Sequence, residues 1–244
     1  MHNNNKAIRR SHILAASAAF ALAGPIAHAD ISRENFTGYA TLTSDYRFRG
    51  LSQTNSDPAL QLGIDFQHDS GIFAGLWGSN VDFPMDRFQQ DPRDVELNYY
   101  LGYHRSISRD WAGVISVIRY AYPGASKNYD YSEVSVGVNY VERLFATVAY
   151  SDDAYSLGGS ATVYELAAQY PLVYGIEIGA TAGLYDSSDL LGRNYKYWNV
   201  GLSKAVRRLS FDVRFHDTDS TATRIFGDEI AGAAWVFSVS LRFL

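Results

Sequence analysis

Charged residues recur at every second position in several otherwise apolar stretches of the 244-residue chain. Asp45, Arg47 and Arg49 alternate with aromatic residues, and Asp212 and Arg214 alternate with apolar ones. Residues two apart in an extended strand share a face, so these side chains would lie on one polar surface. Charges arranged in this way can select the solutes that pass along a pore. The candidate pore-lining residues are Asp45, Arg47, Arg49, Asp65, Glu96, Glu133, Glu165, Glu177, Asp212 and Arg214.

A different chemistry is suggested by His216, which directly precedes Asp217 and lies close to Ser220. A histidine next to a carboxylate can act as a general base toward a hydroxyl, as a lipid-modifying enzyme would require. A histidine at a strand end is more commonly a solvated residue, and His68 and His104 fall in predicted turns. We therefore expect no catalytic residues and no enzymatic activity.

No metal or cofactor is expected either. The chain has no cysteine, which excludes disulfides, thiolate catalysis and cysteine-based metal sites. Acidic loop residues at 152–153, 186/189 and 217/219 could bind a divalent cation or bridge lipopolysaccharide through one. Acidic loops are more commonly just solvated, and none of these has the spacing of an EF-type loop.

The elements that would position these residues are long amphipathic strands. The stretch 36–48 alternates apolar and polar residues and exceeds the roughly 5–6 residues of a typical strand. In 72–81 and 111–122 both faces are apolar, so the sequence leaves open which face is external. Twelve strands are predicted, at 36–48, 60–67, 72–81, 94–103, 111–122, 133–140, 144–151, 164–170, 176–184, 198–202, 211–216 and 237–243.

The connections between these strands alternate between long and short. Outer-membrane barrels have this asymmetry, with short periplasmic turns and longer external loops. Open sheet edges are not tolerated in lipid, so membrane strands must close into a barrel. The pattern predicts an all-β, transmembrane, antiparallel up-and-down barrel with both termini at the periplasmic side. Interfacial aromatic girdles are expected from Tyr46, Phe48, Tyr103, Tyr120, Tyr122, Tyr140, Tyr150, Tyr170, Trp198 and Trp235.

The first 29 residues have the features of a cleaved signal peptide. Lys6, Arg9 and Arg10 precede an apolar stretch at 13–23, and a small-x-small site ends at Ala29. Residues 30–244 would then form the barrel domain. Three of the 21 basic residues and none of the 26 acidic residues lie in the signal, so the remainder is distinctly acidic. This balance argues against a nucleic-acid partner.

Several motifs occur together in the chain: Ser44-Asp-Tyr-Arg-Phe-Arg-Gly-Leu-Ser-Gln53, the stretches 71–81 and 94–103, and the corner Tyr122-Pro-Gly124. On these motifs the mature chain resembles the TorF-type porin family, proteobacterial exported proteins of unknown function. The resemblance implies an outer-membrane barrel with a channel role and supplies no catalytic residues. Such barrels usually end on an aromatic residue read by the insertion machinery, and here Phe243 precedes Leu244.

We expect an outer-membrane, porin-like channel for passive diffusion of small hydrophilic solutes or ions. The alternative is a structural or surface-binding barrel whose lumen is filled by mutually paired charged side chains. Expected partners are outer-membrane lipid, lipopolysaccharide, the barrel-insertion machinery and small solutes. The sequence leaves the oligomeric state open.

Overall fold

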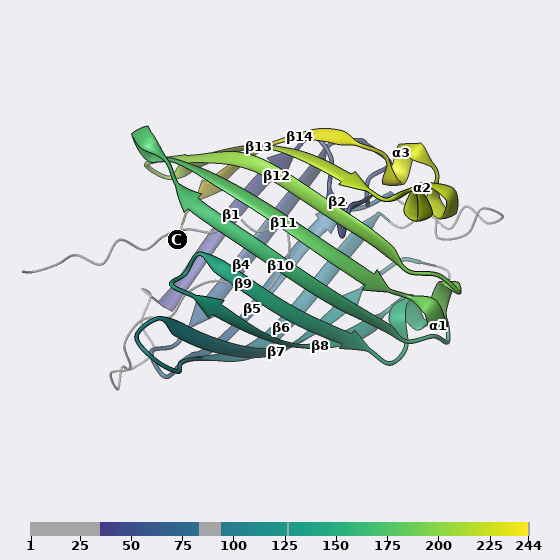
Figure 1. Ribbon diagram of the computed structural model, residues 1–244, viewed down its shortest axis with the longest axis horizontal. Coiled ribbons are helices and arrows are strands. Elements are labelled where there is room, and N and C mark those ends of the chain that lie inside the picture. Colours follow the sequence, from purple (N-terminus) through teal and green to yellow (C-terminus); the bar gives the residue numbers. More distant parts are fainter. Residues whose placement is uncertain (1–34, 83–93, 126, 244) are drawn as a thin grey trace, which may run out of the picture.

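The computed structural model describes residues 35–82, 94–125 and 127–243, in which twelve strands form one closed antiparallel barrel (Figure 1). Each strand pairs with its neighbours in the chain, and β1 pairs with β14 to close the barrel. The predicted fold is therefore confirmed, while the predicted signal peptide at 1–29 lies outside the described residues. The strands are β1 (Phe36–Thr43), β4 (Ala59–Gln67), β5 (Ile72–Asn80), β6 (Val95–Ser106), β7 (Trp111–Ala121), β8 (Tyr131–Tyr140), β9 (Leu144–Ser151), β10 (Ala161–Pro171), β11 (Ile176–Asp186), β12 (Tyr195–Val206), β13 (Leu209–Thr218) and β14 (Ala234–Arg242).

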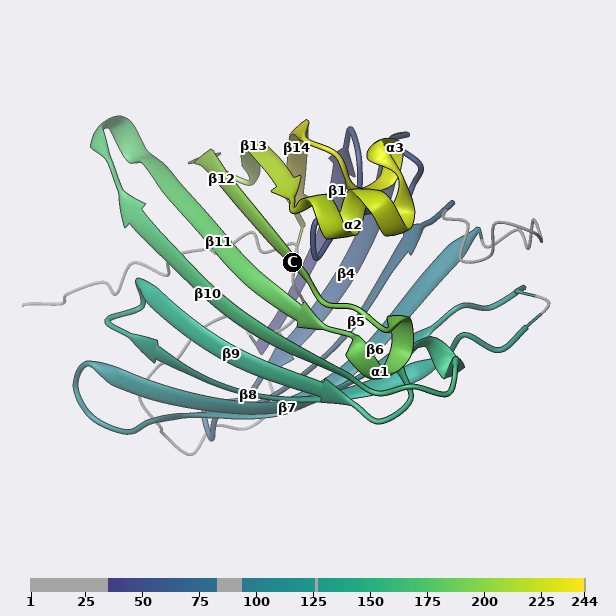
Figure 2. The same ribbon diagram turned by 45° about the vertical axis from the view of Figure 1, so that its right-hand side comes forward.

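The two ends of the barrel differ because short and long connections alternate, as predicted. The short-turn end holds the connections 68–71, 107–110, 141–143, 172–175 and 207–208. The long-loop end holds 44–58, 152–160, 187–194 and 219–233, together with the described residues of the connections that follow β5 and β7. Figure 2 shows the α-helices of these longer connections at one end: α1 (Ser188–Leu191), α2 (Ser220–Phe226) and α3 (Asp228–Ala231). Within the described ranges, no helix is both long and apolar enough to cross a membrane.

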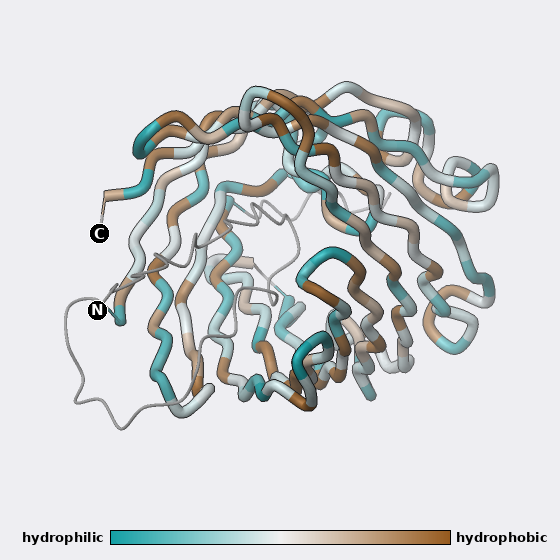
Figure 3. The backbone as a smooth tube through the Cα atoms, turned by 60° about the vertical axis from the view of Figure 1, so that its left-hand side comes forward, coloured by the Kyte–Doolittle hydropathy of each residue, from teal (hydrophilic) through white to brown (hydrophobic). Residues whose placement is uncertain are grey.

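The outer surface of the barrel is apolar and the inner surface is mainly polar. Leu42, Leu166 and Phe237 are 60%, 65% and 59% exposed on the outside. Their neighbours Thr41 and Glu165 point inward, and in Figure 3 apolar and polar residues alternate along the strands. An apolar exterior with a polar interior is the arrangement of a membrane barrel rather than of a water-soluble one.

The structure also assigns the faces of the two strands that are apolar on both sides. Leu76 of β5 and Ile115 of β7 are 52% and 50% exposed on the outside. Trp77 and Tyr120 lie on the inner side, where both pack in the same buried cluster. The inward faces of these strands carry apolar residues such as Trp77, Ile118 and Tyr120 and, along their described lengths, no charged residue, which explains why the sequence pattern could not distinguish the faces.

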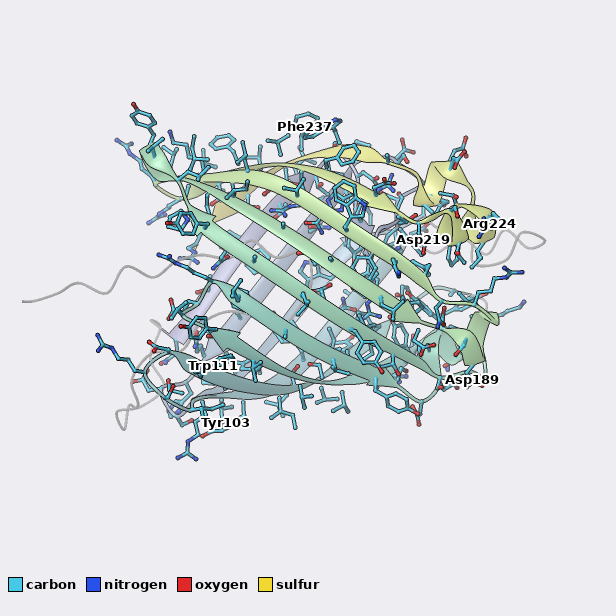
Figure 4. All side chains as sticks on the ribbon, viewed as in Figure 1. Tyr103, Trp111, Asp189, Asp219, Arg224 and Phe237 are labelled. Carbon is cyan, nitrogen blue, oxygen red and sulfur yellow. The ribbon has the colours of Figure 1, made fainter. Side chains whose placement is uncertain are left out.

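Aromatic side chains form two outer groups, one near each end. Phe215 contacts Trp198 and Trp235 near the long-loop end, with ring centroids 5.5 and 5.2 Å apart. Trp111 and Tyr140 are 4.9 Å apart near the short-turn end, and Figure 4 shows Tyr103, Trp111 and Phe237 on the outside. Six predicted girdle residues lie outside: Tyr103, Tyr140, Tyr150, Tyr170, Trp198 and Trp235. The prediction is wrong for Tyr46, Phe48, Tyr120 and Tyr122, which pack inside the barrel.

Close contact between a tyrosine and a glycine on the neighbouring strand fixes part of the inner wall. Tyr197 of β12 pairs directly with Gly183 of β11, and a Cβ atom at Gly183 would collide with the Tyr197 ring. The Tyr197 hydroxyl donates a hydrogen bond of 2.8 Å to Glu165.

We expect Gly183→Ala to displace the Tyr197 ring and destabilise the barrel by about 1–3 kcal/mol, the usual cost of overpacking. The temperature at which the folded band disappears on a heat-modifiability gel measures this loss. Gly113→Ala is the control, because its new Cβ would meet only the tip of the Ile107 side chain at 3.2 Å. Equal transition temperatures for the two variants would contradict the expected collision.

Candidate functional site

The chain turns into the barrel directly after β1. The Ser44 N–H is still bonded to the wall, donating to the Phe237 carbonyl at 2.9 Å. The following residues form a small antiparallel hairpin of β2 (Arg47–Phe48) and β3 (Leu51–Ser52). The prediction of one strand over 36–48 is therefore wrong, because β1 ends at Thr43. We call residues 45–53 the lumen hairpin.

The buried carboxylate of Asp45 organises the lumen hairpin. It accepts hydrogen bonds from the Ser52 hydroxyl at 2.6 Å, from the Thr54 hydroxyl at 3.2 Å and from Arg47 Nε. Short polar side chains that bond nearby groups compete with a strand ladder, so these contacts favour a turn over a continued strand. Asp45 and Arg47 form an ion pair with side-chain exposures of only 6% and 3%.

The tip of the lumen hairpin reaches the far wall of the barrel. Arg49 donates two parallel hydrogen bonds of 2.7 Å to the two carboxylate oxygens of Glu133 on β8. Strand β8 is five strands away from β1 in one direction around the barrel and seven in the other, so the hairpin and this ion pair together cross the lumen. The Arg49 guanidinium also lies 5.4 Å from the ring centre of Tyr185 on β11 and 4.5 Å from that of Phe48.

Aromatic side chains fill the space around the hairpin. The Tyr46 ring lies 5.3 Å from Trp77, and the Phe48 ring lies 5.7 Å from Tyr120. Beside them, Tyr155 packs 4.5 Å from Tyr131. Burial is the main cause that raises the pKa of Tyr155 to about 12.

The connection 219–233 holds the hairpin from the other side. Arg47 donates to the backbone carbonyls of Ile230 and Gly232, both at 3.0 Å. The Thr218 hydroxyl donates to the Ala231 carbonyl at 2.7 Å. The hairpin is thus fixed by Arg47 to the β13–β14 connection and by Arg49 to β8.

Burial inside the lumen changes along the barrel axis. Near the long-loop end, inward residues such as Glu96, Glu133 and Tyr195 are at most 3% exposed. Near the short-turn end, inward residues such as Asp65 and Glu177 are partly exposed. Inward side chains are therefore partly exposed toward the short turns and almost fully buried at the level of the hairpin.

All ten candidate pore-lining residues lie on the inner side of the barrel wall or in the lumen hairpin. Asp45, Arg47, Arg49, Glu96 and Glu133 meet at or beside the hairpin. Closer to the short-turn end, Arg214 pairs with Asp212 at 3.0 Å and Tyr100 donates to Asp65. That these residues line a conducting pore stays a prediction.

The inner charges are distributed unevenly around the barrel. The inward faces of β6 to β12 carry Glu96, Glu133, Glu165 and Glu177 and, within the described residues, neither lysine nor arginine. The inner arginines come from the hairpin, β13 and β14: Arg47, Arg49, Arg214 and Arg242. We call the inward face of β6 to β12 the acidic wall, and Arg49 bridges to it.

The sequence matches a known protein family over most of its length. Residues 27–243 match the family described as "Bacterial protein of unknown function (Gcw_chp)". The chain belongs to this family. No curated protein matches the sequence.

Solved structures resemble this Gcw_chp protein in fold. The "KdgM porin" superposes with a TM-score of 0.50 at 10% sequence identity, covering 86% of this chain and 98% of that one. The "NanC porin" gives a TM-score of 0.50 at 8% identity, with the same coverages. At such low identity the likeness extends to the barrel fold alone.

In this Gcw_chp protein, the residues that suggested catalysis do not converge. His216 is buried on the inner face of β13, and the next residue, Asp217, points to the opposite face. The Asp217 carboxylate accepts from the Thr218 N–H at 2.8 Å, and the Ser220 hydroxyl accepts from Arg224 at 3.1 Å. The arrangement that would activate a nucleophile is not formed by these residues.

The acidic loop residues act as local hydrogen-bond acceptors. Asp153 accepts from the Gly158 N–H at 2.7 Å, and Asp219 accepts from two N–H groups at the start of α2. The Ser160 N–H, 2.7 Å from the Asp189 carboxylate, lowers the pKa of this exposed group. In the part of the chain that the structure describes, no three metal-ligating side chains come together.

Proposed function

We propose that the protein is an outer-membrane, porin-like channel for small hydrophilic solutes or ions, with the lumen hairpin as its constriction. The apolar exterior with two aromatic groups suits a bilayer, in which strands must close as they do here. The long-loop end would face outward and both termini the periplasm. The likeness to TorF-type porins, a signal peptide cleaved after Ala29 and insertion through Phe243 belong to this proposal.

The observation that carries the proposal is the gradient of burial inside the barrel. A purely structural barrel has no need of a polar lumen whose inward side chains are partly exposed at one end. Near the other end, the inward side chains are buried around the lumen hairpin. Loops can enter the lumen of a membrane barrel, and charged side chains that line a pore select the solutes that pass.

A second function is favoured by one specific observation. The side chains of the Arg49–Glu133 pair are only 10% and 4% exposed and join the hairpin to the wall strand β8, as expected for a permanently closed barrel with a structural or surface-binding role. The two functions differ in whether any solute passes.

Liposome swelling distinguishes them. Reconstituted protein should admit monosaccharides, such as arabinose, and admit trisaccharides far more slowly, because the hairpin limits the width of the lumen. Protein unfolded by heat before reconstitution is the control. Absence of swelling with every sugar, from protein shown to be folded by gel shift, would favour the closed barrel.

A further inference from the structure

The lumen hairpin places a guanidinium group in a site built by the barrel wall. Glu133 offers both carboxylate oxygens, each 2.7 Å from an Arg49 nitrogen, and Tyr185 offers a ring face. The Tyr120 hydroxyl donates to Glu133 at 3.3 Å and orients the carboxylate. This parallel pair of bonds matches a planar guanidinium, whereas an ammonium ion binds as a point charge.

The backbone at Arg49 is unfavourable for this residue type. Arg49 and Gly50 have φ angles of 51° and 82° at the tip of a two-residue hairpin turn. The first position of such a turn favours Asn, Asp or Gly, because the left-handed conformation brings the Cβ atom of other residues too close to the backbone. A residue keeps such an unfavourable backbone conformation when its other contacts hold it in place. Here the Arg49 side chain supplies those contacts through Glu133.

The wall part of the site does not depend on the hairpin. Glu133, Tyr120 and Tyr185 stand on β8, β7 and β11, whose ladders fix their positions. The acidic wall supplies no arginine or lysine of its own within the described residues. Without Arg49, Glu133 would be a buried carboxylate without a cation, which is strongly unfavourable.

We infer that the acidic wall at Glu133, Tyr120 and Tyr185 is a binding site for small molecules bearing a guanidinium group, and that Arg49 occupies it as a tethered ligand. The inference goes beyond the proposed channel, because binding at this site requires no conduction. It predicts that a soluble guanidinium compound competes with Arg49, or replaces it where Arg49 is absent.

Chemical rescue tests the inference. Arg49→Ala protein in detergent is heated with millimolar methylguanidinium chloride, and the temperature of barrel unfolding is read from the gel shift. We expect a rise of several degrees over equal concentrations of methylammonium or potassium chloride, because ligand that binds only the folded state stabilises it. The wild-type protein should show a much smaller rise, since Arg49 already fills the site.

The double variant Arg49→Ala, Glu133→Gln is the matched control and should lose the rise. Arg49→Gln replaces Arg49→Ala if the smaller side chain prevents folding. Equal effects of methylguanidinium and methylammonium, or a rise that survives Glu133→Gln, would overturn the inference. So would a folded Arg49 variant that methylguanidinium does not stabilise. Solute permeation is measured separately by swelling, so failure of the channel proposal would be distinguishable.

Discussion

Asp45→Ala is expected to release the lumen hairpin from the barrel interior. Asp45 is the counterion of Arg47 and also accepts from Ser52 and Thr54. Its removal leaves the Arg47 guanidinium buried without a carboxylate, and breaking a buried ion pair in this way costs about 3–5 kcal/mol. The hairpin can avoid this cost by local opening while the strand ladders of the barrel stay intact.

Limited trypsin digestion measures this opening. Cleavage after Arg47 or Arg49 should be slow in the wild-type protein and fast in Asp45→Ala. Asp57→Ala is the control, because Asp57 lies in the same connection but is exposed. Equal cleavage of the two variants would show that Asp45 does not hold the hairpin.

The largest functional effect is expected from removing the lumen hairpin altogether. Thr43 and Ala59 are direct partners of the β1–β4 ladder, so a two-residue Asn-Gly turn between Ser44 and Pro58 can join these strands. The remaining lumen would be lined by wall side chains and water. Trisaccharides that the wild-type protein admits slowly should then enter liposomes at nearly the rate of monosaccharides.

A shortened loop elsewhere separates this effect from general loosening of the barrel. The connection 187–194 joins β11 and β12 at the same end, and its helix α1 is not part of the lumen hairpin. Shortening it should leave the size limit unchanged. An unchanged size limit after removal of the lumen hairpin would rule it out as the constriction.

Most of the barrel could be predicted from the sequence because its pattern is local. Along β4, Leu60, Leu62 and Ile64 alternate with polar residues, and each such strand contains the information about its own faces. The alternation of short and long connections then indicates toward which end of the barrel each strand runs. Strand ends are less predictable: the sequence predicts a strand at 198–202, whereas β12 covers Tyr195–Val206, because strand pairing continues beyond the apolar band.

The lumen hairpin could not be predicted in the same way, because its pattern also has a period of two. Tyr46 and Phe48 continue the alternation of β1, so a hairpin strand and a wall strand look identical in sequence. The contacts that separate them are distant: Glu133 lies 84 residues from Arg49, and Ile230 lies 183 from Arg47. The Arg49-Gly50 pair followed by hydroxyl residues was the available local sign of a turn.

The His216–Asp217 dyad could not be excluded from the sequence, because the predicted strand 211–216 ends at His216 and leaves Asp217 in a loop. In the structure β13 continues to Thr218, and adjacent residues of a strand point to opposite faces. The aromatic residues Tyr120 and Tyr185 were missed as site residues, because outer girdles and a packed lumen use the same residue types.

Single-channel recording in planar bilayers tests the central proposal most directly. Folded wild-type protein should insert and give stepwise increases in current of uniform, small size, and the protein without the lumen hairpin should give larger steps. Both barrels must first show the gel shift of a folded barrel. Inserted, folded protein that gives no current steps, with or without the hairpin, would contradict the proposed channel.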